Sequence, residues 1–594
     1  MLVHNAPLFS KTKVRFITKL RSGYSMKKIT SGFLFLTIVF SVIISMGISV
    51  SAGVEYDVTM NPEYLYKDII DAVYDEFYDF SNYYEETETK DIDYDFIIQI
   101  DLSHLNINVD VVFDIFGTLF CQYPEFFFLD GWMSASYYPD TGMSACIYFR
   151  TAYHIDEIPE MIEKFEASAS SVLEEASKLK TDLDKILFVH NYIVMNTKYN
   201  EEVIDGGDGE YRVYTAYGVL VDRDAVCQGY AFAFNYLVRR LGIMSEYVVS
   251  DEINHGWNIV KVGDYWYHLD ATWDDPIYDY VGKIYYDNFL TSEAKIIETG
   301  HTGINDNRIT NGTSTNYNVS STRFDDLFLH NRSAFRGNTA YHNGKWYFMM
   351  NANDGYAYIC CTDNVFVTQS ELSYDVVVKC TSTNDIPGLY IYENRLYYTK
   401  RSGIYTCNFD GTNETAVYLP SLASGERVYG LAIREGSVFF NIEKSYNTSN
   451  KAHPPIYSCK ITPPTPNSNA TFSQSGTIIW NIPYGTTAAE ILNMFSDDCY
   501  ITDAGGKKLS DDSVLGTGCM VKSSGNQSAH LFLTIAVTGD ANGDALINGK
   551  DVIRLRKYLK QIETDVIYSL CGDIDGDGKL TDADISSLVK IVNN

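Results

Sequence analysis

The spacing of apolar residues changes along the chain between a helical period and a strand-like period. Apolar positions three to four residues apart predict a helix over residues 157–180, and a second helix follows over 181–194. The buried face of the first helix is expected to consist of Ile162, Phe165, Ala169 and Val172. Alternating runs farther along the chain predict strands.

Two alternating runs meet at Gly263-Asp264 and predict a β-hairpin with a type II′ turn. If the strands pair directly across this turn, His255 is the diagonal neighbour of Asp270 on one face. The backbones of such neighbours are about 7–8 Å apart, a gap that an imidazole and a carboxylate can close. His268 lies on the same face, so the pattern alone does not choose between the two histidines.

Cys227 stands at the predicted start of another helix. The apolar face of this helix is formed by Tyr230, Phe234, Leu237 and Leu241, with Gly242 at its end. The dipole and the free N–H groups of a helix N-terminus stabilise a thiolate and can hold an oxyanion. A lone cysteine is usually a small buried apolar residue, so it becomes a candidate nucleophile only with a base and an orienting acid nearby.

Four segments around these residues resemble the transglutaminase-like superfamily, whose bacterial members are related in fold to papain-type cysteine proteases. They are residues 217–220, 225–231, 255–258 and 266–273. The resemblance covers residues 166–300 and implies an α+β, papain-like core. It also implies Cys227 as nucleophile, His255 as general base and acid, and Asp270 as the residue that orients the histidine.

Three further positions complete the expected site. Gly256 stands where alanine is common after the histidine, and we expect this difference to have little consequence. No side-chain oxyanion donor is evident, and Gln228 is the candidate. His190 is expected to be structural, packed within its helix.

A turn followed by an aromatic strand occurs three times between residues 325 and 462, at 341–348, 392–398 and 434–440. These intervals are typical of propeller blades, but three copies are too few to close an ordinary propeller. The region is therefore predicted to be a partial or irregular propeller-like repeat, with a β-sandwich as the alternative.

Two twelve-residue acidic loops near the C-terminus have the spacing of calcium-binding loops. Calcium prefers six to eight oxygen ligands, which such loops supply from positions 1, 3, 5, 7, 9 and 12. The first loop offers Asp540, Asn542, Asp544, the carbonyl of Leu546, Asn548 and Asp551. The second offers Asp573, Asp575, Asp577, the carbonyl of Lys579, Thr581 and Asp584. Two matching copies favour two Ca²⁺ sites over solvated acidic turns.

Each loop ends in Asp instead of the usual Glu and is followed by one helix, over 552–559 and 585–592, so residues 539–594 resemble an α-helical type I dockerin. The resemblance implies a cohesin on a scaffoldin as partner and a secreted, extracellular protein associated with a cell-surface cellulosome. Cohesin contacts are implied at loop positions 10 and 11, which are Gly549, Lys550, Asp582 and Ala583. Ala545 stands where the first loop needs glycine for its sharp turn, so weaker calcium binding is expected there.

The N-terminus has the pattern of a secretory signal. Lys27 and Lys28 precede an apolar run over 33–50, and Ala52 closes a small-x-small cleavage site. A signal peptide over 1–52 is predicted, with Met26 as a possible true start, and a transmembrane anchor is the alternative. After cleavage no stable membrane insertion is expected. An accessory α/β region over 53–165 follows.

Length and charge narrow the function. At 594 residues the chain requires several domains. Residues 1–53 hold seven basic and no acidic residues, so removing them takes the formal charge from −31 to −38. Such a chain repels nucleic acids and anionic membranes.

The 11 cysteines show no zinc-site spacing, and an odd number leaves at least one thiol unpaired in an exported chain. Cys499 and Cys519 are a possible disulfide, with two reduced thiols as the alternative. They lie in a small β module at 468–538, which follows a proline-rich linker at 463–467 and is expected to be a spacer.

The predicted function is cleavage or transfer of amide bonds of proteins or peptides through a thioester. The sequence does not choose between water and an amine as acceptor. A non-catalytic binding or scaffold component is the alternative. A carbohydrate-active enzyme is a further alternative, but it would need two positioned carboxylates, and no region indicates such a pair.

Overall fold

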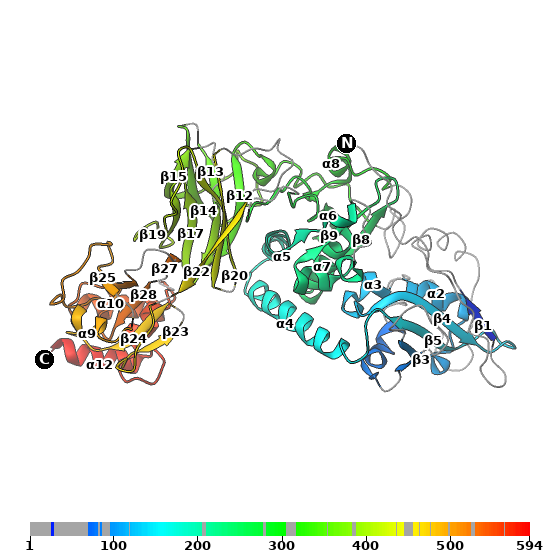
Figure 1. Ribbon diagram of the computed structural model, residues 1–594, viewed down its shortest axis with the longest axis horizontal. Coiled ribbons are helices and arrows are strands. Elements are labelled where there is room, and N and C mark those ends of the chain that lie inside the picture. The colour runs from blue at the N-terminus through cyan, green and yellow to red at the C-terminus, as the bar shows by residue number, and fades with distance from the viewer. Residues whose placement is uncertain are drawn as a thin grey trace. The chain divides into compact units, whose positions relative to one another are not determined.

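The computed structural model of the chain forms two compact units (Figure 1). It describes residues 25–28, 69–80, 83–85, 96–117, 119–204, 210–276, 281–304, 317–352, 354–382, 388–434, 436–444, 455–462, 464–475, 477–496, 499–523, 529–530, 532–562 and 565–593. The predicted signal peptide lies outside this set except for residues 25–28. Within the described residues, no helix is both long and apolar enough to span a bilayer.

The first unit begins with a five-stranded antiparallel sheet in the order β1-β4-β5-β3-β2. Its strands are β1 (Ser25–Lys28), β2 (Tyr83–Glu85), β3 (Phe96–Asp101), β4 (Leu129–Tyr137) and β5 (Ser144–Thr151). The short helices α2 (Val109–Gly117) and α3 (Leu119–Gln122) lie between β3 and β4 in the chain.

A second, four-stranded sheet and three helices complete the part of this unit that carries the candidate site. The sheet has the order β11-β10-β9-β8. Its strands are β8 (Ser245–Ser250), β9 (His255–Val262), β10 (Tyr265–Leu269) and β11 (Phe289–Thr291). The helices are α4 (Ile158–Ser177), α5 (Asp182–Asn196) and α7 (Cys227–Arg240). Helix α7 packs on β8 and β9 and is also in contact with α4 and α5 (Figure 1).

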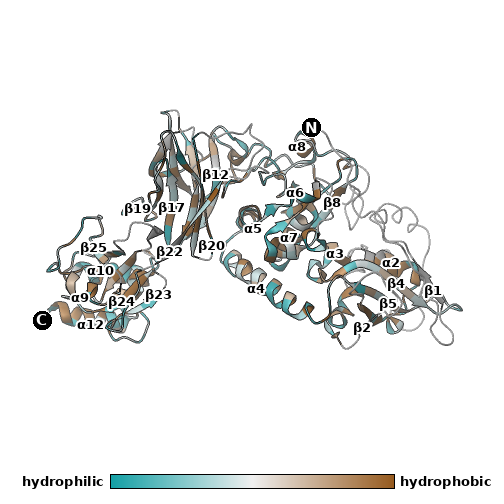
Figure 2. Cartoon of the chain, viewed as in Figure 1, coloured by the Kyte–Doolittle hydropathy of each residue, from teal (hydrophilic) through white to brown (hydrophobic). Residues whose placement is uncertain are grey.

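Helix α4 has one apolar and one polar side (Figure 2), and its buried face differs by one position from the sequence prediction. Phe165, Ala169 and Val172 are buried as expected. Met161 is also buried, whereas Ile162 is only partly covered. Both residues are apolar and adjacent, so the helical period alone could not separate them.

The hairpin of β9 and β10 has the predicted register. Val262 pairs with Tyr265 and Asn258 with Leu269, which leaves Asp270 directly after the end of β10. Positive φ falls on Gly263 and not on Asp264, as a type II′ turn requires.

The second unit contains three four-stranded sheets built from the β-repeat region, and residues of the 468–538 module supply the last strand of the third sheet. The first holds β12 (Phe335–His342), β13 (Lys345–Asn351), β14 (Tyr356–Thr362) and β15 (Asp375–Ser382). The second holds β16 (Leu389–Tyr392), β17 (Arg395–Lys400), β18 (Gly403–Cys407) and β19 (Thr415–Tyr418). The third holds β20 (Arg427–Arg434), β21 (Ser437–Glu443), β22 (Ile456–Thr462) and β27 (Ala529–His530). A hairpin opens each sheet where the sequence showed a turn and an aromatic strand, but the described residues do not establish the closed ring of a propeller.

The small module is a five-stranded sheet in the order β23-β24-β28-β26-β25. Its strands are β23 (Ser473–Ser475), β24 (Ile478–Ile482), β25 (Cys499–Thr502), β26 (Met520–Ser523) and β28 (Leu533–Val537), with helix α9 (Ala488–Leu492). Cys499 and Cys519 are both free thiols.

Three helices follow the small module: α10 (Gly549–Leu559), α11 (Ile567–Gly572) and α12 (Asp582–Asn593). Helices α10 and α12 follow the two acidic loops as predicted, although each starts three residues earlier. The expectation of one exiting helix per loop was incomplete, because α11 also leads into the second loop. These helices share an apolar core with Ile478, Trp480 and Ala536 of the small module.

Candidate functional site

Cys227 is the first residue of α7, and the local sequence explains why the helix begins there. The preceding Val226 is extended and makes no side-chain cap, so the first N–H groups of the helix are not capped by that residue. A Cβ at Gly229 would lie 2.8 Å from the carbonyl oxygen of Val213 and 2.9 Å from that of Thr215. Glycine therefore allows the first turn of α7 to pack closely on this segment.

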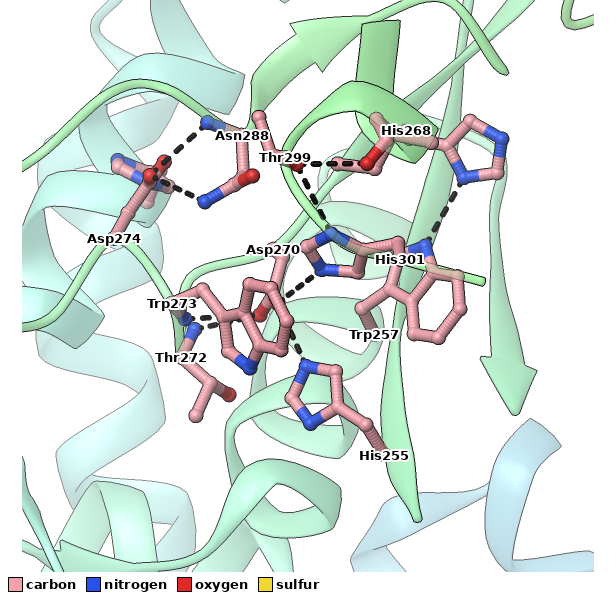
Figure 3. A network of polar contacts seen from close by, with 12 residues as sticks. His255, Trp257, His268, Asp270, Thr272, Trp273, Asp274, Asn288, Thr299 and His301 are labelled. Carbon is pink, nitrogen blue, oxygen red and sulfur yellow. Dashed lines mark hydrogen bonds and ion pairs between the residues drawn. The ribbon is translucent and has the colours of Figure 1, made fainter. Parts of the chain in front are cut away.

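His255 begins β9, and Asp270 follows β10 across the hairpin. The Nε2–H of His255 donates to Oδ2 of Asp270 at 2.7 Å (Figure 3). The other carboxylate oxygen, Oδ1, accepts from the backbone N–H groups of Thr272 at 2.9 Å and Trp273 at 3.2 Å. Both residues are buried, so the carboxylate is fixed before any substrate binds.

Charge within this pair outweighs the effect of burial. Burial alone lowers the pKa of His255, but the charge and hydrogen bond of Asp270, together with a hydrogen bond to Cys227, raise this pKa to about 10. For Asp270, burial raises the pKa, and the charge and hydrogen bond of His255 pull it below its usual range. Asp270 is therefore ionised and His255 protonated near neutral pH, with the thiol of Cys227 beside the imidazole.

The structure separates the two histidines that the sequence left equivalent. Nδ1 of His268 accepts from the indole N–H of Trp257 at 3.0 Å, and its Nε2 has no hydrogen-bond partner among the described residues, Asp270 included. Burial, with the nearby His301, lowers the pKa of His268 to about 3. His268 is therefore a neutral core residue.

Sequence reasoning missed His301, which shares the carboxylate of Asp270. Its Nε2–H donates to the same Oδ2 at 2.8 Å, and its Nδ1 lies 3.1 Å from Oγ1 of Thr299 (Figure 3). His301 lies 31 residues beyond Asp270 and just outside the predicted domain end at residue 300. Neither its spacing nor its neighbours in the chain indicate a role.

A second buried pair, formed by His190 and Asp274, supports the turn after β10. Nε2 of His190 is 3.1 Å from Oδ2 of Asp274, and Oδ1 of Asp274 accepts from both the backbone and side-chain N–H groups of Asn288 at 3.1 Å. Burial raises the pKa of Asp274 to about 6, against the hydrogen bond from His190. These contacts tie the turn to α5, in agreement with a structural role for His190.

The side-chain amide of Gln228 donates one N–H to the carbonyl of Tyr214 at 3.1 Å, so only its second N–H could serve an oxyanion. The first turn of α7 instead lies beside Tyr199. Tyr199 pairs with Ala225 in the short parallel ladder of β6 (Lys198–Tyr199) and β7 (Asp224–Ala225). Its hydroxyl accepts from the backbone N–H of Cys227, and burial with the charge of Cys227 raises its pKa.

The two acidic loops fold in the same way. Asp540 accepts from the backbone N–H groups of Gly543 and Ala545, and Asp573 accepts from those of Gly576 and Gly578. The carboxylates of Asp573, Asp575 and Asp577 supply oxygens within 4.8 Å of one another. This donor set fits a calcium ion, which takes oxygen ligands.

The last predicted ligand of each acidic loop lies against the start of the same loop. Asp551 and Asp584 each fold back onto the start of their own loop through backbone N–H groups. Ala545 has a φ of 59°, the left-handed conformation that glycine adopts without strain. The four predicted partner positions, Gly549, Lys550, Asp582 and Ala583, are all exposed.

Two solved structures share limited similarity with the chain. The chain is 16% identical to a structure described as a TGase over 24% of its own length and 44% of the other chain, with a TM-score of 0.18. It is 10% identical to a putative protease from Parabacteroides distasonis over 45% of its length and 54% of the other chain, with a TM-score of 0.17. The chain thus spans about half the length of each. No curated protein matches it significantly.

Family comparisons identify two parts of the chain. Residues 170–271, which include Cys227, His255 and Asp270, match the transglutaminase-like superfamily. Residues 538–593, which include both acidic loops, match the dockerin type I domain. The chain therefore carries a transglutaminase-like domain and a C-terminal type I dockerin domain.

Proposed function

We propose that the transglutaminase-like domain cleaves or transfers amide bonds of proteins or peptides through a thioester on Cys227. The observation that carries this proposal is the buried His255–Asp270 pair, joined at 2.7 Å beside a cysteine at a helix N-terminus. A nucleophile, a base and an acid that orients the base are the minimum for this chemistry.

In the first half-reaction the Cys227 thiolate attacks the amide carbonyl, and the N–H groups that follow Cys227 in the first turn of α7 would stabilise the developing oxyanion. Protonated His255 then gives its proton to the leaving amine as the C–N bond breaks, which leaves a thioester and a neutral imidazole. Asp270 keeps His255 oriented throughout.

In the second half-reaction neutral His255 takes a proton from the acceptor, which attacks the thioester carbonyl. Water gives a carboxylic acid and an amine gives a new amide. In either case the C–S bond breaks and the thiolate is regenerated beside protonated His255. The three residues Cys227, His255 and Asp270 would serve both reactions, and we favour hydrolysis because water is abundant outside the cell.

The test is mass spectrometry of a peptide library incubated with the mature protein, with and without a labelled alkylamine. New peptide termini would show hydrolysis, and incorporated label would show transfer. Cys227→Ala should abolish both. Cys146→Ala, which removes a partly exposed thiol from β5, is the matched control and should leave them unchanged.

An inactive parent protein whose Cys227 reacts with iodoacetamide no faster than an ordinary thiol would favour a non-catalytic binding or scaffold role. Cleavage of a polysaccharide that survives Cys227→Ala would favour a carbohydrate-active enzyme. Either outcome would contradict the proposal.

We further propose that the dockerin domain places this activity on an extracellular, cellulosome-type scaffold by binding a cohesin. The two loops would each hold one Ca²⁺ through the oxygen ligands described above, and this ion would neutralise their carboxylates and rigidify the loops. The exposed residues Gly549, Lys550, Asp582 and Ala583 would contact the cohesin. Because the two copies differ in charge at these positions, we expect one dominant docking face.

A further inference from the structure

One carboxylate oxygen serves two imidazoles in the thiol site. Oδ2 of Asp270 accepts from His255 at 2.7 Å and from His301 at 2.8 Å (Figure 3). Oδ1 is held separately by the backbone N–H groups of Thr272 and Trp273. His301 is therefore not needed to prevent an unsatisfied buried oxygen, because His255 and the backbone already satisfy both.

His301 is held as firmly as the residues of the predicted triad. It is fully buried, and its ring lies 4.9 Å from that of Trp257 and 4.1 Å from that of Trp273. Its Nδ1 lies against Thr299, and its Nε2 faces Asp270. Both ring nitrogens of His301 are engaged, and its hydrogen-bonded route to His255 runs through Asp270. The two imidazole rings also lie 5.6 Å apart.

We propose that His301 is a positioning residue that limits how firmly Asp270 retains the proton of His255. This inference rests on the function proposed above. A carboxylate oxygen that accepts two N–H donors holds each of them less strongly than it would hold one. Since His255 must release its proton to the leaving amine, a second donor on Asp270 makes that release easier.

Other titratable groups surround the carboxylate of Asp270, and any test of His301 must leave these residues unsubstituted. Cys227 faces His255, and Tyr199 and Asp274 lie close enough to interact electrostatically with Asp270. His268 interacts in the same way with His301. The variants that test the proposal leave all of these groups unchanged.

Two substitutions of His301 distinguish the effect of its Nε2–H donor from the effect of the volume of its ring. His301→Phe keeps an aromatic ring between Trp257 and Trp273 but removes the N–H, whereas His301→Gln retains a donor at about the position of Nε2. The pH dependence of Cys227 alkylation by iodoacetamide reports the protonation of the neighbouring imidazole without requiring turnover.

We expect the upper inflection of this profile, where His255 loses its proton, to move up by about one pH unit in His301→Phe, as expected for a lost hydrogen bond to a charged group. His301→Gln should restore the parent profile. With a cleaved peptide as substrate, His301→Phe should lower kcat about tenfold with little change in KM, because only proton release is affected.

An unchanged or lower inflection in His301→Phe would overturn the proposal, as would equal behaviour of the Gln and Phe variants. If His301→Phe fails to fold, Thr299→Val, which frees the ring from its second contact, must still move the inflection relative to the parent. If no amide substrate is turned over, the function proposed above fails, while the alkylation profiles still decide the role of His301.

Discussion

At the scale of single residues, the site is dominated by a buried charge pair whose strength depends on pH. The pKa of His255 is raised to about 10, so its stabilising contribution is complete below about pH 6.5, the value of a free imidazole, and disappears as the pH rises through 10. The pKa of Asp270 is depressed, so its contribution is present above about pH 4 and is lost in stronger acid.

Asp270→Asn should therefore destabilise the region around the hairpin by about 3 kcal/mol at pH 6, the usual result of leaving a buried partner unpaired. The effect should shrink as the pH rises towards 10, because His255 is then neutral in both proteins. Hydrogen exchange of peptides spanning 255–271 in increasing urea measures this difference. Asp264→Asn, in the exposed turn of the same hairpin, is the control, and an effect of Asp270→Asn that does not change with pH would contradict the prediction.

Ala545 offers a second prediction at this scale, because its φ of 59° is strained for any residue with a Cβ. Ala545→Gly should remove a strain of about 1 kcal/mol and tighten calcium binding at the first loop about fivefold. Calorimetric titration of the apo protein would measure this change. Gly578→Ala, the mirror substitution in the second loop, should weaken that site by a similar factor, and an unchanged affinity in both variants would exclude backbone strain as the cause.

At the scale of secondary structure elements, the β8–β9 pair corrects an expectation about Gly256. A Cβ at this position would lie 2.1 Å from the hydroxyl oxygen of Tyr247 and 2.6 Å from its ring. Tyr247 is itself buried on β8, so moving it aside would disturb the packing around it. Glycine at this position is thus required by a side chain from the neighbouring strand.

Gly256→Ala should accordingly destabilise the protein by about 1–3 kcal/mol, as overpacking in a core does, and should reduce Cys227 reactivity by displacing His255. Gly256→Ala combined with Tyr247→Leu should recover part of this loss. Thermal unfolding and iodoacetamide labelling of the single and double variants would measure the coupling. If the single substitution is neutral, the packing argument is wrong.

Sequence patterns within a short stretch of the chain were sufficient to predict elements that depend on residues close together in sequence. The hairpin that joins His255 to Asp270 is set by its turn, and α7 by its apolar period, so both could be predicted. His301 and Tyr247 could not, because they reach the site through tertiary contacts that no periodicity encodes. Closure of the β-repeats depends in the same way on packing between sheets, and repeated hairpins do not determine it.

At the scale of the whole molecule, the first acidic loop is hydrogen-bonded to the small module. The backbone N–H of Thr517 in the module donates to Oδ2 of Asp540 at 3.1 Å. Burial raises the pKa of Asp540, and the charge of Asp551 adds to this effect. A divalent cation would relieve this repulsion.

Chelation should therefore expose more than the dockerin to proteolysis. Without Ca²⁺ we expect cleavage within residues 539–593 and faster cleavage near β24, while Cys227 labelling in the first unit stays unchanged. Limited proteolysis with mass spectrometry, with and without a chelator, checks this outcome. A tail that stays protected in chelator would contradict the calcium assignment.

The shared core has a practical consequence for anyone who wishes to transfer this dockerin domain to a different protein. A fragment cut at residue 538 would leave the helices without Ile478, Trp480 and Ala536, and their apolar faces would be exposed to water. The transferable piece is therefore the module and the loops together, from about residue 468 onward. The shorter fragment should express poorly or aggregate even when calcium is abundant.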